Sequence, residues 1–478
     1  MPGIKLVTST LAGPKNSAAA PSGRGFIVGI TERGTLTPAA VRSIVEYQRE
    51  FGGLTSFSGH MYRAAQTFFE EGGAELVVAR AVGTTPTLAT VTVVDRTAVT
   101  PLSTMRLDAA NPGAWGASLT YQVTAGAVAN SVNLAVFLNG SRVSYVTNKT
   151  TVADIVTALS ADPYVRAADL GAASTYPTRL PAVGGPTPLT GGNDDRATVN
   201  AAKIVTVANG IGVSYGPGAI AAPGYNATLV GAGLIAHAKA NRRVAVLAGD
   251  VTSVPSDLVT MAAALVTDGQ YGGIYGPWLV VPDGSGTAQV SPEGFVLGVR
   301  GRVMNLSGFW QAAAGGRTAA RYVLGPVTTW DATVIDTLAD GRVNGITVVA
   351  GDTQVYGWRS MTALIDQFNL LNAQDVMNTL GGLVEDTLQQ YVFDTIDGTG
   401  QLVARVKGAL IGVLQPIADA GGFTGKYDAD NNLVSPPYRV EVSVSGETSL
   451  AATVTVRLSG VAEEIQVSLV KAAYNATI

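Results

Sequence analysis

Helical and strand patterns alternate along the chain between residues 193 and 360. The predicted helices lie at 194–209, 226–241 and 256–267, and the predicted short apolar strands lie at 218–222, 244–248 and 277–281. Parallel strands need a long crossover connection, which is usually a helix. The alternation therefore predicts βαβ units and an α/β domain with a largely parallel sheet.

An earlier segment, residues 23–86, adds two helices and two short apolar strands to the same α/β core. Ser43 is a suitable N-cap for a helix that Gly52-Gly53 ends, and a second helix is predicted over residues 60–71. The order strand, helix, helix, strand is typical of an α/β or α+β layer.

Residues 87–192 change to a pattern of period two, which is typical of strands. Asn139-Gly140 separates two apolar runs and predicts a type I′ hairpin, because both residues tolerate positive φ. A helix is predicted at about 152–159, and the Thr/Pro/Gly-rich stretch 175–192 is interpreted as a linker. We interpret residues 87–192 as a small, mostly β domain inserted into the α/β middle domain of residues 193–360.

The C-terminal part, residues 361–470, is predicted to be an α+β core domain. Helices are expected near 361–371, 373–392 and 399–420, followed by strands within 437–470. Residues 1–22 and 471–478 have the character of extended arms. A single strand is marginal alone, so the strand-competent N-terminal arm needs a sheet edge, which another chain can offer.

Composition excludes several classes of function. Charged residues make up 14% of the 478 residues, the net charge is −4 and the pI is about 5.4, so a nucleic-acid footprint is not expected. There is no basic run for an anionic membrane, no apolar run long enough to span one, and no secretory signal at the start. The absence of cysteine excludes disulfides and thiolate sites, and two histidines limit zinc binding and catalysis, so we expect no metal and no cofactor.

One catalytic motif needs consideration. Gly212-Val213-Ser214-Tyr215-Gly216 matches the G-x-S-x-G pattern of a nucleophile elbow. That elbow requires a helix directly after the serine, and Pro217-Gly218 blocks one. No acidic residue lies between Ser214 and His237, so the order Ser, acid, His cannot end at that histidine. A Gly-rich loop is therefore favoured, and a serine hydrolase using Ser214 is kept as an alternative.

Two weaker motif matches are interpreted structurally. Gly231-Ala232-Gly233 falls inside a predicted helix and not between a strand and a helix, so its small residues favour close packing over dinucleotide binding. The segment Asp428 to Asn432 resembles the start of a calcium loop, but Leu433 and Arg439 stand where Gly and Glu are required. An exposed turn is favoured there.

Several motifs, in order along the chain, carry a resemblance to the contractile tail sheath proteins of tailed bacteriophages and related injection particles. The segments that resemble the family are Phe51-Gly52-Gly53, Ala64 to Gly73 (AAQTFFEEGG), Ala110 to Gly116 (ANPGAWG), Leu189 to Asp194 (LTGGND), Ala222-Pro223-Gly224, Asn344-Gly345-Ile346 and Val355 to Ser360 (VYGWRS). The resemblance covers nearly the whole chain.

The resemblance implies a structural subunit and not an enzyme. It implies a middle domain of subtilisin-like topology, without a protease triad, and a mixed core domain built from N- and C-terminal segments. Hexameric rings would stack around a tail tube protein, with baseplate and tail terminator proteins at the ends. The particle would assemble in the bacterial host cytoplasm and become a virion tail, without membrane insertion. A static capsid or shell protein is a further alternative.

Two sets of residues are expected to make contacts in such an assembly. Strand exchange between neighbouring subunits is expected at Ile4, Lys5, Leu6, Val7 and Thr8 and at Gln466, Val467, Ser468, Leu469 and Val470. Contact with the tube is expected at Arg405 and Lys407 on the predicted helix 399–420.

Overall fold

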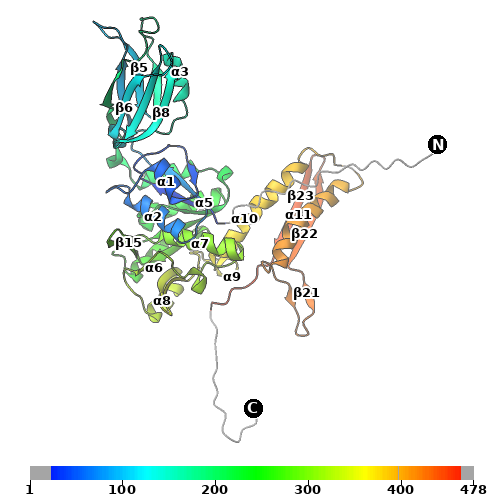
Figure 1. Cartoon of the computed structure of the whole chain (residues 1–478). Coiled ribbons are helices and arrows are strands. Elements are labelled where there is room, and N and C mark those ends of the chain that lie inside the picture. The colour runs from blue at the N-terminus through cyan, green and yellow to red at the C-terminus, as the bar shows by residue number, and fades with distance from the viewer. Residues whose placement is uncertain (1–22, 397, 464–478) are drawn as a thin grey trace, which may run out of the picture.

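The computed structural model describes residues 23–396 and 398–463, which form three parts (Figure 1). We call residues 23–86 with 194–370 the central domain, residues 87–193 the inserted domain, and residues 371–463 the C-terminal domain. The two arms predicted to exchange strands, Ile4–Thr8 and Gln466–Val470, lie outside the described residues.

The central domain is built on one eight-stranded sheet in the order β19-β18-β14-β13-β12-β1-β3-β2. The six inner strands run parallel, and an antiparallel strand closes each edge. The strands are β1 (Gly25–Gly29), β2 (Ala39–Val41), β3 (Leu76–Arg80), β12 (Gly218–Ala221), β13 (Arg243–Ala248), β14 (Gly272–Gly276), β18 (Val343–Val349) and β19 (Asp352–Tyr356). The predicted α/β class with a largely parallel sheet is confirmed.

Helices cover both faces of this sheet and bury two apolar cores. Successive side chains of β1 point to opposite faces, so Ile27 lies in one core and Phe26 in the other. One face carries α1 (Ile44–Phe51), α2 (Gly59–Glu70) and α7 (Glu293–Ser307), and the other carries α4 (Ala201–Asn209), α5 (Ala227–Ala240), α6 (Pro255–Ala264) and α8 (Ala332–Asp340). The result is a three-layer α/β domain.

Local sequence signals place several of these elements. The Ser43 hydroxyl accepts a hydrogen bond from the Glu46 N–H at 3.1 Å, and Gly52 follows α1 with φ of 89°, so the predicted cap and stop are confirmed. The strand predicted at 277–281 forms two residues later, at 279–283, but its predicted place in the central parallel sheet is wrong. The central sheet uses β14, and the next segment belongs to a small separate sheet of β15 (Leu279–Asp283), β16 (Gly286–Val290) and β17 (Gly325–Pro326).

The inserted domain consists of two four-stranded antiparallel sheets around one core that includes Trp115 and Leu119. Its elements are β4 (Thr87–Val94), β5 (Ser103–Ala109), β6 (Leu119–Ala125), β7 (Val132–Leu138), β8 (Ser141–Lys149), α3 (Val152–Ala158), β9 (Val165–Asp169), β10 (Gly184–Pro188) and β11 (Thr190–Asn193). Asn139 and Gly140 have φ of 50° and 80° between β7 and β8, which confirms the predicted hairpin.

The predicted linker 175–192 is wrong in its second half, because β10 and β11 form there. Both are edge strands, where proline is tolerated since one side of the strand needs no N–H donor. Asn193 at the end of β11 pairs with Thr87 at the start of β4, so the chain leaves and rejoins the central domain at adjacent points.

The C-terminal domain packs helix α11 against a two-stranded sheet (Figure 1). Its helices are α10 (Leu371–Leu388) and α11 (Gln401–Asp419), and the short helix α9 (Ile365–Phe368) precedes it. Its strands are β20 (Lys426–Tyr427), β21 (Leu433–Ser435), β22 (Tyr438–Gly446) and β23 (Ser449–Val456). The helix expected at 361–371 is thus reduced to the four residues of α9.

Short 3-10 helices complete the described residues. They are η1 (Ala114–Ser118), η2 (Arg196–Thr198), η3 (Val213–Tyr215), η4 (Gly269–Tyr271), η5 (Gly315–Thr318) and η6 (Gln389–Tyr391).

Candidate functional site

The candidate site is the strand pair β22–β23 of the C-terminal domain. The two strands have nine and eight residues, and each pairs only with the other among the described residues. Each strand therefore presents one outer edge whose N–H and C=O groups have no strand partner in this part of the chain. An open edge is a template for a further strand, and a two-stranded sheet alone is marginal.

The two faces of this strand pair differ in polarity. One face packs on α11 through Val440, Val442, Val454 and neighbouring apolar side chains. The opposite face exposes Arg439 and Glu441, among other polar residues. Side chains of a strand alternate between faces, so an added strand would need apolar residues at every second position.

Helix α11 supports the sheet with a stripe of buried side chains at positions 402, 406, 410, 414 and 417. Arg405 and Lys407 lie off this stripe and are exposed. Arg405 makes an ion pair with Asp394 at 3.3 Å, in which both side chains are partly exposed, so the pair contributes little stability. Lys407 has no charged partner within the described chain. The prediction that both residues contact a tube stays a prediction.

The Ser214 motif forms a loop that Arg243 stabilises by hydrogen bonds to the loop backbone. The Arg243 guanidinium donates hydrogen bonds to the carbonyl oxygens of Ile211, Gly212 and Gly216 at 2.6, 2.7 and 3.2 Å. Exposed Ser214 lies in η3, which precedes strand β12, whereas an elbow serine lies between a strand and a helix. The favoured interpretation as a Gly-rich loop agrees with this geometry.

His237 does not serve Ser214 either. Its Nε2 accepts a hydrogen bond from Arg243 Nη1 at 2.8 Å, and the residue is 2% exposed in helix α5. Burial, followed by the positive charge of Arg243, lowers the pKa of His237 to about 4. His237 is thus a packed residue of the central domain.

The other weak motifs have structural roles. A Cβ at Gly231 would lie 2.6 Å from Leu265 and one at Gly233 2.6 Å from Val205, so these glycines allow close helix packing. Asp428 accepts the backbone N–H groups of Asp430 and Asn432 at 3.0 and 2.7 Å in a tight turn. Over residues 23–396 and 398–463, no cluster of His, Asp and Glu could hold a metal ion, and no helix is long and apolar enough to cross a membrane.

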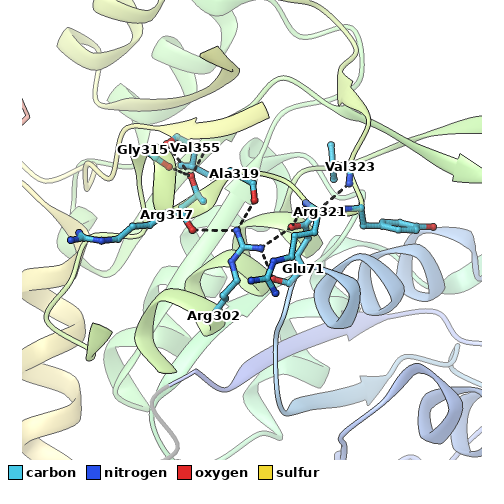
Figure 2. Close-up of polar contacts among 10 residues, drawn as sticks. Glu71, Arg302, Gly315, Arg317, Ala319, Arg321, Val323 and Val355 are labelled. Atoms are coloured by element: carbon cyan, nitrogen blue, oxygen red, sulfur yellow. Dashed lines mark hydrogen bonds and ion pairs between the residues drawn. The ribbon is translucent and has the colours of Figure 1, made fainter. Parts of the chain in front are cut away.

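A buried carboxylate that the sequence analysis missed joins three segments of the central domain (Figure 2). Glu71 follows α2, and its carboxylate accepts the backbone N–H groups of Arg321, Tyr322 and Val323 at 2.9–3.1 Å. The Arg302 guanidinium from α7 donates to the same carboxylate at 3.3 Å and to the carbonyls of residues 317 and 319. The side chains of Glu71 and Arg302 are 0% and 6% exposed, so this node is structural and leaves no open position for a ligand.

A second buried ion pair joins the central and C-terminal domains. Arg300 of α7 donates two hydrogen bonds to Asp375 of α10, at 2.6 and 3.2 Å, and both side chains are at most 3% exposed. No sequence signal pointed to either buried pair, because the partners are 231 and 75 residues apart.

A third buried acid lies at the start of α7. Glu293 is 1% exposed, and its Oε2 has no hydrogen-bond partner among the described residues. Burial raises the pKa of this carboxyl to about 7, although hydrogen bonds from Ser291 and backbone groups oppose the shift.

A scan against protein-family models finds no match, and a search of curated proteins finds none either. Solved structures do match over nearly the whole chain. The sheath tail protein of Desulfitobacterium hafniense is 14% identical with a TM-score of 0.59, covering 95% of this chain and 100% of that one. The sheath tail protein of Listeria innocua is 13% identical with a TM-score of 0.60, covering 91% and 94%.

A third solved structure is the sheath complex, in the contracted state, of an extracellular contractile injection system called PVC. It is 14% identical to this chain with a TM-score of 0.53, covering 98% of this chain and 97% of that one. At such low identity the likeness concerns the fold, and it confirms at that level the resemblance drawn from the sequence motifs. The chain has the fold of contractile tail sheath proteins.

Proposed function

We propose that this chain is the structural subunit of a contractile tail sheath. The observation that carries the proposal is the strand pair β22–β23, which lacks strand partners on both outer edges in the described chain while the whole fold matches sheath proteins. Subunits of a polymer that must stay connected while they move need links that tolerate rotation. Main-chain pairing at a sheet edge provides such links.

The terminal arms have the sequence pattern that these open edges require. Ile4 and Leu6 alternate with Lys5, and Val467 and Leu469 alternate with Gln466 and Ser468. An incoming arm could therefore direct its apolar side chains toward α11 and its polar side chains toward solvent. We propose that arms of neighbouring subunits occupy the edges of β22 and β23.

In the assembly we propose, six subunits form a ring around a tail tube, and rings stack into a helical sheath. The C-terminal domain and the arms form the inner layer, and the central domain, whose parallel sheet we compare with subtilisin topology, lies outside together with the inserted domain. Baseplate and tail terminator proteins contact the ends of the sheath. The particle assembles in the bacterial cytoplasm and carries the sheath as part of its tail.

Contraction in this proposal uses no cofactor and no catalytic residue. In the extended lattice the contacts between subunits are less favourable than in the contracted lattice. This difference in free energy is released when subunits slide and rotate. Arg405 and Lys407 are our candidates for contact with the tube, because both are exposed on helix α11, which supports the strand pair β22–β23.

The experiment is electron microscopy of the purified full-length protein beside two arm variants. The full chain is expected to form hollow striated tubes, and deletion of residues 1–20 is expected to abolish them. Leu6→Ser should weaken tube formation strongly, whereas the matched change Lys5→Ser on the other face of the arm should not. Closed shells would favour a static shell protein, and normal tubes from the deletion variant would contradict strand exchange.

A further inference from the structure

The short helix α9 begins with aliphatic side chains that the described part of the chain leaves uncovered. Leu364 and Ile365 are each 54% exposed, and Ala363 before them is exposed as well. Helix α9 has only four residues and no side-chain cap among the described residues, and so short a helix is not stable in water without tertiary contacts. We call residues 363–365 the α9 patch, and we ask what could cover it.

Helix α9 lies on a loop, residues 359–370, whose two ends meet. Arg359 and Leu370 pair as a short β-bridge, and the Ser360 N–H donates to the Asn369 carbonyl at 2.9 Å. Leu364 is five residues from Arg359 along this loop. At about 3.6 Å per residue, the two residues are therefore at most about 18 Å apart.

The described chain ends beside the base of the same loop. After β23, the Ser459 hydroxyl donates to the Gly421 carbonyl at 2.7 Å, and the chain then leaves the strand pair β22–β23 toward the central domain (Figure 1). There Glu463 makes an ion pair with Arg359 at 3.2 Å, in which the side chains are 38% and 26% exposed. This contact places the start of residues 464–478, which we call the terminal segment, next to the loop that carries α9.

The terminal segment has the sequence pattern that an apolar cover requires. Ile465, Val467 and Leu469 are separated by the polar residues Gln466 and Ser468. In an extended chain, side chains at every second position point to the same face. The three aliphatic side chains can therefore pack together on the α9 patch while the polar ones stay in water.

The terminal segment is also long enough to reach the α9 patch. Leu469 is six residues after Glu463, and an extended chain of six residues spans about 20 Å, which exceeds the largest separation of about 18 Å. The charges are complementary as well. Lys471 is the one basic residue of the terminal segment, and Asp366 is an exposed acidic residue of α9.

We propose that residues 465–469 fold back onto the α9 patch of the same chain before assembly. These residues include our candidates for strand exchange, so a chain in this state withholds them from its neighbours. The covered patch is small, whereas addition to a sheet edge also forms main-chain hydrogen bonds, so an available edge displaces the contact. The effect on assembly rests on the proposed function, and the docking itself depends only on the single chain.

The test is photo-crosslinking in the monomer fraction of the full-length protein. Ala363→benzoylphenylalanine places the cross-linking group beside Leu364 and Ile365 and keeps both. Chains grown with ¹⁴N and with ¹⁵N are mixed, so that mass spectrometry separates cross-links within one chain from those between chains. We expect cross-links within one chain, which fragmentation assigns to residues 464–470. Leu364→Ser with Ile365→Ser should lower their yield by at least about fivefold, because the apolar contact is lost.

Two control variants accompany this pair. Leu229→Ser with Val254→Ser changes two other aliphatic residues, which are 66% and 52% exposed, and should leave the yield unchanged. Glu463→Gln removes the ion pair with Arg359 and should lower the yield by up to about fivefold. The same change at the exposed turn residue Glu447 should have no effect.

Three results would overturn the docking. Cross-links only between chains would mean that a second copy covers the α9 patch. A product without cross-links to residues 464–470 would place the terminal segment elsewhere. A yield that Leu364→Ser with Ile365→Ser does not lower would show that these side chains do not hold the segment.

The effect on assembly has a separate readout. Leu364→Ser with Ile365→Ser should shorten the lag of tube formation in light scattering, because residues 465–469 are then free from the start, and an unchanged lag would contradict the competition with strand exchange. Absence of tubes from the unchanged protein would contradict the sheath function. Cross-links within one chain would still establish the docking in that case.

Discussion

Replacing Glu71 by glutamine tests whether one buried carboxylate holds the central domain together. The change keeps the shape of the side chain and opens no cavity, so its effect measures charge and hydrogen bonding alone. One glutamine oxygen can keep the acceptor role toward Tyr322 and Val323. The new NH₂ group then faces the Arg302 guanidinium, so two donors meet where a donor and an acceptor met before.

The size of the effect follows from the burial of both partners. With Glu71 0% and Arg302 6% exposed, the substitution leaves a buried, uncompensated positive charge. Removing one partner of such a pair costs about 3–5 kcal/mol. For a cooperative unit of this size, each kcal/mol shifts the melting temperature by about 2–4 °C, so we expect a decrease of about 6–20 °C.

The assay is urea unfolding and thermal unfolding of the full-length protein, followed by tryptophan fluorescence. Four of the five tryptophans lie in the central domain, at positions 278, 310, 330 and 358, so this signal reports mainly on that domain. The matched control is Glu70→Gln at the exposed neighbouring position, which should change stability by less than about 0.5 kcal/mol. If Glu71→Gln proves as stable as this control, our account of the Glu71–Arg302 node is wrong.

Three further predictions concern other parts of the chain. Because the pKa of Glu293 is raised to about 7 in the folded state, its contribution to stability is full below about pH 4.5 and falls as the pH rises toward 7. The stability of Glu293→Gln relative to the unchanged protein should therefore increase by about 3 kcal/mol between pH 4.5 and 8 in urea unfolding, and a difference that does not vary with pH would contradict this. Gly140→Val should destabilise the inserted domain by about 1–3 kcal/mol through backbone strain at φ of 80°, as monitored by Trp115 fluorescence. Unchanged stability of the inserted domain would mean that the turn can change its type, and it would contradict this prediction. Arg405→Glu with Lys407→Glu should still let the sheath protein assemble into hollow polymers. In micrographs of co-expressed sheath and tail tube proteins, this variant should give sheaths that contain no inner tail tube. Sheaths filled by a tail tube would argue against the proposed contact.

The sequence was informative where a short segment determines its own structure. Ser43 with Gly52, and Asn139 with Gly140, set helix ends and a turn through local hydrogen bonds and backbone angles, and these predictions are confirmed. The helix predicted at 399–420 is also confirmed, as α11 (Gln401–Asp419), which buries one stripe of apolar side chains and keeps its other face in solvent.

Elements whose environment is set by distant residues were missed. Helix α7 is buried on nearly all sides, so it has no apolar stripe, and its Arg300 and Arg302 are neutralised by acids far away in the chain. Strand β14 consists largely of glycine, since Met361, Asn344 and Leu258 occupy the space that its side chains would need. Neither feature leaves a local pattern.

The open strand pair β22–β23 is a similar case. The alternation of its residues predicted strands, but only the fold shows that both edges lack a strand partner in the described chain. The pairing of the arms themselves stays a prediction.

The adjacent ends of the inserted domain have a consequence for how this chain can vary. Thr87 and Asn193 pair with each other, so residues between them branch from a single point on the central domain. Such an outgrowth can be lengthened, exchanged or lost while the flanking strands keep their positions. Evolution can therefore change the surface carried by residues 87–193 separately from the strand pair and the arms that we propose to join subunits. A foreign domain with closely spaced termini, grafted at the same point, would be displayed once on every copy of the chain.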